Sequence, residues 1–156
     1  MDIFKILDEL KIKYDILEHQ AVYTVEEAKQ LEDMIEGLGC KNLFLTDKKG
    51  NYFILVLEEN KKANLKELAK LLNVSKLTFA SEEALQEILG LEPGSVTPLS
   101  IINDKENKVL LIIDNDIVDK KILVHPNTNT KTMSIEFKDI EKLIEHTNHK
   151  YILYKE

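Results

Sequence analysis

Two polar loops in the second half of the chain carry residue types suited to holding a small ligand. The first is Gly94-Ser95-Val96-Thr97-Pro98. A glycine without a Cβ lets backbone N–H groups approach a ligand closely, and the proline four residues later stiffens the exit. The second is His125-Pro126-Asn127, where a histidine at an expected strand end can point into a cleft and position a substrate. Taken alone, each loop is more often an ordinary connection.

Lys41 is a further candidate, because it alternates with apolar residues in an expected strand. It is either a solvated lysine at a strand edge or a cation that reaches an anionic group of a substrate. The chain has 21 lysines and no arginine. Any phosphate or carboxylate must therefore be held by lysine point charges, hydroxyls or backbone N–H groups.

Nucleophilic and metal chemistry find little support in the residue pattern. Cys40 is the single cysteine, which excludes an internal disulfide, and it fits a buried strand residue better than a nucleophile paired with His19 or His125. His146 and His149 stand three apart without a carboxylate or thiolate partner, which favours a surface helix end over a metal site. We therefore expect no metal and no other cofactor.

Composition and charge limit the classes of function. The chain has 156 residues, of which 44% are hydrophobic and 31% charged, as expected for one globular domain over residues 1–156. The net charge of −7 argues against sequence-independent binding of duplex nucleic acid over a large surface. Residues 37–81, however, hold four acids and eight lysines, a net charge of +4. They form either a solvated face or an anion-facing surface.

The N-terminus lacks the apolar core of a signal peptide, and the longest apolar run, 109–113, is too short to span a bilayer. With one cysteine, this predicts a cytoplasmic protein without a membrane partner.

The elements that must position the candidate residues follow from hydrophobic periodicity and capping signals. Helices are expected after the N-caps Asp2, Thr24, Asn64 and Ser81, and over 139–146. Thr24 and Glu27 form a capping-box pattern, and their helix is expected to run to about Glu36 and close at Gly37. Strands are expected over 14–19, 40–46, 52–58, 76–80, 99–102, 109–113, 123–125, 132–137 and 151–154. This mixture predicts an α+β fold, a mixed and largely antiparallel sheet or partial barrel surrounded by helices.

Three segments resemble, in order and spacing, the bacterial prolyl-tRNA editing domain family. They are Lys41-Asn42-Leu43-Phe44-Leu45, Gly94 with Pro98 four residues on, and His125-Pro126-Asn127. Residues 18–28 also resemble the family's N-terminal signature, although relatives often carry proline where this chain has Gln20 or Ala21. The family includes the editing insertion of bacterial prolyl-tRNA synthetase and freestanding deacylases that act in trans.

The resemblance implies hydrolysis of mischarged Ala-tRNA(Pro), releasing alanine and free tRNA. The alternatives are Cys-tRNA(Pro) or another small aminoacyl-tRNA as substrate, and a non-catalytic binding module. It also implies that the vicinal ribose hydroxyl of the substrate helps to activate the attacking water, with no protein nucleophile. Lys41 would then hold the 3′ end, Gly94 would bring backbone donors to the aminoacyl group, and His125 would shape and polarise the pocket.

The same resemblance supplies further substrate-binding candidates: Asn42, Ser95, Pro98, Asn127 and Glu27. Glu27 could face the α-amino group, but the capping box explains it better. The implied partners are the 3′ end of tRNA(Pro) and, as a candidate, prolyl-tRNA synthetase.

Overall fold

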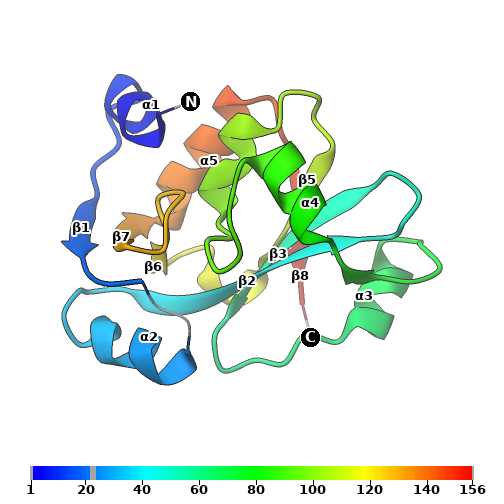
Figure 1. Cartoon of the computed structure of the whole chain (residues 1–156), viewed down its shortest axis with the longest axis horizontal. Coiled ribbons are helices and arrows are strands. Elements are labelled where there is room, and N and C mark those ends of the chain that lie inside the picture. Colours follow the sequence, from blue (N-terminus) through cyan, green and yellow to red (C-terminus); the bar gives the residue numbers. More distant parts are fainter. Residues whose placement is uncertain (1, 22–23, 156) are drawn as a thin grey trace.

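Strand β2 crosses the whole molecule and organises the sheet around it (Figure 1). The computed structural model describes residues 2–21 and 24–155. The strands are β1 (Asp15–Glu18), β2 (Leu38–Thr46), β3 (Tyr52–Glu58), β4 (Thr78–Phe79), β5 (Val109–Asp114), β6 (Lys121–Val124), β7 (Lys131–Glu136) and β8 (Tyr151–Tyr154). The helices are α1 (Ile3–Glu9), α2 (Val25–Glu32), α3 (Leu65–Leu71), α4 (Glu82–Ala84) and α5 (Phe137–His146), with a π-helical turn η1 (Leu85–Leu89) and the 3-10 turns η2 (Pro98–Asn103) and η3 (Asn115–Ile117).

The sheet order is β1-β7-β6-β2-β3-β5-β8, and β4 adds to β2 beside this path. Four of the strand pairings are antiparallel and three are parallel. The expected mixed, largely antiparallel sheet is thus confirmed. The sheet is open, with β1 and β8 at its two ends.

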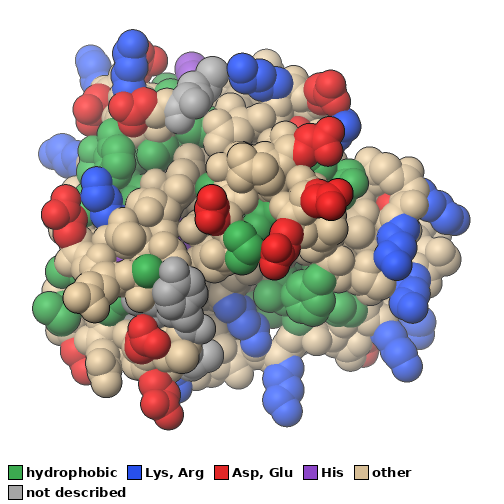
Figure 2. Space-filling model, viewed as in Figure 1, with side chains coloured by type: hydrophobic (Ala, Val, Ile, Leu, Met, Phe, Trp, Pro, Cys, Tyr) green, Lys and Arg blue, Asp and Glu red, His purple; other side chains and the backbone are tan. Residues whose placement is uncertain are grey.

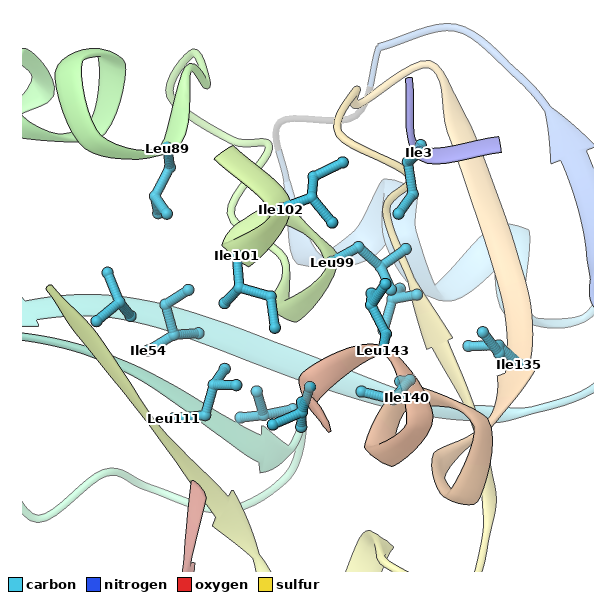
Figure 3. Close-up of a cluster of buried hydrophobic side chains, with 14 of the residues drawn as sticks. Ile3, Ile54, Leu89, Leu99, Ile101, Ile102, Leu111, Ile135, Ile140 and Leu143 are labelled. Atoms are coloured by element: carbon cyan, nitrogen blue, oxygen red, sulfur yellow. The ribbon is translucent and has the colours of Figure 1, made fainter. Parts of the chain in front are cut away.

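Helices cover both faces of the sheet, so the strands are buried on two sides. The larger core packs one face against α1, η1, η2 and α5, with Ile54 and Leu111 from the strands meeting Leu89, Ile101 and Leu143 from the helices (Figure 3). The smaller core packs the other face against α3. Neighbouring residues of β2 serve different cores, because side chains alternate along a strand: Phe44 joins the first core and Leu45 the second.

The capping signals of the sequence are confirmed at the helix starts. Asp2, Thr24, Asn64 and Ser81 each accept a backbone N–H with the side chain. The helix after Thr24 ends at Glu32, about one turn earlier than expected, and a turn at residues 33–34 follows it. Ser134 Oγ donates to the carbonyl of Glu36 and ties the segment that leads into β2 to β7.

The expected strand over 99–102 is wrong, because this segment forms the 3-10 turn η2. Thr97 Oγ1 accepts the N–H of Leu99 at 3.3 Å, Pro98 occupies the first helical position, and Ser100 Oγ donates to the carbonyl of Thr97 at 2.6 Å. Threonine followed by proline is a helix-start signal. The prediction was wrong because Leu99 and Ile101 are both buried. With apolar residues on every side of the turn, the sequence shows no helical periodicity.

His149 is also placed differently from expectation. It is 6% exposed, and its Nε2 lies 2.9 Å from Asp104 Oδ2. Asp104 further accepts the backbone N–H groups of Lys108 and Val109. Burial alone would raise the pKa of Asp104, but the hydrogen bonds from His149 and these two N–H groups hold it below the usual range. The pair joins the end of η2 to the approach to β8.

No helix in the described ranges is long and apolar enough to cross a membrane.

Removing Asp104 should destabilise the protein strongly. We expect Asp104→Ala to lower the free energy of unfolding at pH 7 by about 3 kcal/mol, because it leaves His149 and two N–H groups buried without their acceptor. Because the pKa of Asp104 is lowered by folding, this contribution is present above its unfolded pKa of about 3.9 and disappears as pH falls through the folded value. Urea denaturation measures it, with exposed Asp119→Ala as the control. A loss below about 0.5 kcal/mol would show that the pair does not stabilise the fold.

Candidate functional site

A cavity lies between α2, the start of β2 and the end of β6. We call it the His125 cavity. Its lining is Leu31, Glu32, Gly39, Cys40, Asn42, Glu59, Leu123, Val124, His125 and Thr132. Sheet pairing brings these segments together, since Gly39 of β2 is paired in parallel with Leu123 of β6. Two predicted site residues, His125 and Asn42, therefore share one cavity.

A second, more apolar depression lies on the other side of Asn42. We call it the Gly94 groove, and its lining is Asn42, Leu43, Phe44, Phe79, Ala80, Ser81, Glu82, Leu85, Pro93, Gly94 and Val96. Asn42 lines both hollows. The predicted Gly94 and His125 thus belong to two adjacent compartments instead of one pocket.

His125 is held as a neutral hydrogen-bond acceptor. Its Nδ1 lies 3.2 Å from the carbonyl oxygen of Lys131, and because a carbonyl only accepts, Nδ1 carries the proton. Burial lowers the pKa of His125 and outweighs the hydrogen bond to the Lys131 carbonyl, which raises it; the neighbouring His19 lowers it slightly further. At neutral pH the ring is therefore uncharged, with Nε2 free to accept a hydrogen bond from a ligand.

His19 supports the same wall of the cavity. Its Nε2 lies 2.8 Å from Thr132 Oγ1, and its Nδ1 lies 2.7 Å from the carbonyl of Gln20. Because that carbonyl can only accept a hydrogen bond, Nδ1 carries the proton, and His19 Nε2 accepts from the Thr132 hydroxyl when the ring is neutral. This contact fixes the orientation of a polar side chain that lines the cavity.

Two amide oxygens, one of them in the cavity lining, are buried without a hydrogen-bond donor from the described part of the chain. They are Asn42 Oδ1 and Asn127 Oδ1. Asn127 follows His125 closely and adopts a left-handed backbone with φ of +61°, which asparagine tolerates. Buried carbonyl oxygens in folded proteins are normally paired. Both acceptors are therefore suited to a ligand rich in N–H or O–H donors.

The remaining members of the first loop support its shape. Gly94 has φ of +88°, and a Cβ there would stand 3.6 Å from Asn129 Nδ2, so the loop lies against the segment that follows His125. Ser95 and Pro98 are buried and line neither hollow. Pro98 begins η2, which joins the loop to the core.

Lys41 and Glu27 lie away from both hollows. Alternation along β2 directs Lys41 to the face of Leu45, opposite that of Asn42 and Phe44. Glu27 is exposed, and its backbone N–H donates to Thr24 Oγ1 at 3.1 Å, as in a capping box. Its carboxylate also accepts from the Thr24 hydroxyl at 3.0 Å. The geometry thus favours the cap for Glu27 over a ligand contact.

A carboxyl pair in the cavity was missed in the sequence analysis. Burial, a hydrogen bond to Glu59 and repulsion from the charge of Glu59 raise the pKa of Glu32 to about 7. Both carboxyl groups lie over Gly39, where a Cβ would collide with them. The two glutamates are far apart in sequence, so only the packing of α2 on the sheet brings them together.

Cys40 lines the cavity but is not a nucleophile. Burial, followed by the charges of Asp114 and Glu58, raises the pKa of its thiol to about 12. Such a thiol stays protonated at neutral pH. In the described ranges, moreover, no group of three or more His, Cys, Asp or Glu side chains is placed to hold a metal ion.

These features define a class of site in which hydrogen-bond acceptors and negatively charged carboxyl groups of the protein position a small polar ligand. Comparison with known sequences gives the family. The aminoacyl-tRNA editing domain matches residues 19–143, and the chain belongs to this family.

Full-length relatives agree with the assignment. The chain is 39% identical over 140 residues to the prolyl-tRNA editing protein ProX of Acetoanaerobium sticklandii, covering 88% of this chain and 85% of that protein. It is 34% identical over 153 residues to the mouse (Mus musculus) prolyl-tRNA synthetase associated domain-containing protein 1, covering 94% and 90%.

Solved structures share the fold. A candidate trans-editing enzyme for prolyl-tRNA synthetase superposes with a TM-score of 0.71 at 17% identity, covering 99% of this chain and 97% of that one. A hypothetical protein superposes with a TM-score of 0.74 at 18% identity, covering 97% and 98%. At these identities the likeness establishes the architecture alone.

The carboxyl pair predicts a titration near neutral pH. We expect Glu32 to lose its proton with a midpoint near 7, and Glu59→Gln to move this midpoint toward the ordinary 4.5, because the neighbouring negative charge is removed. The side-chain carboxyl carbon shift of Glu32, followed by NMR against pH, measures it. Glu106→Gln, on an exposed turn, is the control. An unchanged midpoint in Glu59→Gln would assign the shift to burial alone.

Proposed function

We propose that this chain hydrolyses the ester bond of mischarged Ala-tRNA(Pro) in trans. Membership of the aminoacyl-tRNA editing family, together with a relative named for prolyl-tRNA editing, supports an editing function. The observation that carries the proposal is the His125 cavity. It combines a neutral histidine acceptor, the buried acceptor of Asn42 and a carboxyl pair, but no activated nucleophile.

The choice of alanine rests on size. A synthetase pocket built for proline cannot exclude the smaller alanine sterically, and contacts in such a pocket discriminate by only about 1–3 kcal/mol per methylene. A second site that admits the smaller side chain and rejects proline supplies the missing accuracy. The whole chain, residues 1–156, is this editing domain, acting in the cytoplasm on the 3′ end of tRNA(Pro) after release from, or delivery by, prolyl-tRNA synthetase.

In the His125 cavity, the charged ammonium of the alanyl group faces Glu32 and Glu59. When Glu32 is protonated, the pair carries one negative charge, which matches the single positive charge of the ammonium. Asn42 Oδ1, which belongs to the cavity lining, accepts a further N–H of the ammonium, and Asn127 Oδ1, two residues after His125, offers a second buried acceptor. These contacts fix the amino acid relative to the ribose.

The chemical step uses the substrate's own hydroxyl. His125 Nε2 accepts a hydrogen bond from the vicinal ribose hydroxyl, which in turn orients and helps to deprotonate a water molecule. The water oxygen bonds to the ester carbonyl carbon, the bond to the ribose 3′ oxygen breaks, and that oxygen takes the proton. The loop at Gly94, held by the buried Ser95 and Pro98, borders the adjacent groove and positions the nucleoside end of the ester.

Lys41 acts on the tRNA and not on the ester in this scheme. Its side chain points to the opposite face of β2 from Asn42, so its ammonium is available to a phosphate that passes the strand edge. Glu27 keeps its capping role.

Parallel deacylation of Ala-, Cys-, Ser- and Pro-tRNA(Pro) tests the proposal. We expect Ala-tRNA(Pro) to be hydrolysed at least about 10-fold faster than each of the others, since one extra group in a fitted pocket discriminates by that order. His125→Ala should approach the uncatalysed rate.

Two results would contradict the proposal. Faster hydrolysis of Cys-tRNA(Pro) would change the substrate. Tight binding of tRNA without hydrolysis of any ester would make the chain a binding module.

A further inference from the structure

Phe79 is a large aromatic side chain that the fold leaves exposed. It is 64% exposed on the two-residue strand β4, whose backbone is fixed by pairing with β2. Phe79 lines the Gly94 groove together with Phe44, Ala80 and Pro93. The other strongly exposed apolar side chains of the described residues, Met34 and Leu71, do not line this groove. Phe79 contributes little to either core, so its exposure requires another explanation.

We propose that Phe79 is the stacking platform for the terminal base of the tRNA 3′ end, seated in the Gly94 groove. This inference rests on the proposed function and adds a positioning residue to it. A flat, apolar, aromatic-bordered groove suits the face of an unpaired nucleobase, and single-stranded bases are commonly bound by stacking on phenylalanine.

The groove continues from the cavity that holds the ester. Asn42 lines both hollows, and Phe79 is paired with Leu45 of β2, three residues further along the strand. At about 3.3 Å per residue this separation is about 10 Å. A ribose with its ester at one end and its base at the other bridges such a span. The aminoacyl group then lies beside His125 and the base beside Phe79.

Charge along β2 gives the direction of the remaining nucleotides. Beyond Thr46, which is paired with Thr78, the β2–β3 turn carries the exposed Lys48 and Lys49, and exposed Lys76 precedes β4. Figure 2 shows apolar side chains exposed near the middle of this face. Lysines gather toward the edge where Figure 1 places the β2–β3 turn and α3, and acidic side chains lie on the other side of the apolar patch.

Glu82 borders the groove at the start of α4 and would repel a phosphate there. The phosphates therefore run toward the lysines, which bind them as point charges.

The test compares two RNA minihelices charged with alanine, one ending in adenosine and one ending in an abasic ribose. On the adenosine minihelix, we expect Phe79→Ala to raise KM about 10-fold with kcat within about twofold, because stacking contributes to binding and not to the chemical step. Phe79→Tyr and Phe79→Trp should restore KM. On the abasic minihelix, wild type and Phe79→Ala should have equal KM. Leu71→Ala, also exposed, is the matched control and should behave as wild type on both.

Other outcomes overturn the inference. An unchanged KM for Phe79→Ala on the adenosine minihelix, or an equal loss on both minihelices, would show that the ring does not hold the base. A kcat loss that Phe79→Tyr does not restore would assign Phe79 a structural role in the groove. If wild type hydrolyses neither minihelix, the proposed function fails instead, which separates the two hypotheses.

Discussion

The alternation of side chains along β2 is the constraint on which the rest of the structure depends. This nine-residue strand pairs with β6 at its start, with β3 along its length and with β4 at its end. The pairings fix one register, in which Asn42 faces the hollows while Leu45 packs in the smaller core. A slip by one residue would bury Lys41 on the side of the cavity and expel Asn42 from it. The core and the site are therefore specified by the same hydrogen-bonded ladder.

The chemistry of the site follows from what this ladder brings together. Gly39, at the start of β2, leaves room for the carboxyl groups of Glu32 and Glu59. The pairing of β2 with β6 at this point brings His125 and Asn42 into one cavity. Acceptors and one shared negative charge dominate the cavity. The one thiol is protonated, and the histidines are held by carbonyl and hydroxyl partners. Such a site can orient a small polar ligand, and the proposed function takes that ligand to be an aminoacyl ester of ribose.

Local signals in the sequence predicted most of the fold. Capping residues placed the helix starts, and short apolar runs bounded by turn residues placed β2, β3, β5 and β8. The segment that forms η2 was misread because its residues are buried all round, and burial on all sides removes the periodicity that separates helix from strand. His149 was misread because its partner, Asp104, is distant in sequence.

The site was predictable only in part for the same reason. The motifs around Asn42, Gly94 and His125 are local, so they could be read from the chain. The Glu32–Glu59 pair and the exposure of Phe79 depend on how α2 and β4 meet β2, which no local pattern encodes. The position of Lys41 opposite Asn42 was implicit in strand alternation, and the proposed function accordingly gives this lysine a contact with the tRNA backbone instead of the ester.

The central claim is that the chain positions an ester whose own ribose hydroxyl activates the water. The most direct measurement is the rate at which wild-type protein hydrolyses alanine from tRNA(Pro) ending in 2′-deoxyadenosine, compared with native Ala-tRNA(Pro). Loss of the vicinal hydroxyl should slow the catalysed reaction at least about 100-fold, as expected when a general acid–base group is removed. Hydrolysis of both substrates at equal rates would contradict the account, since a group of the protein would then have to activate the water.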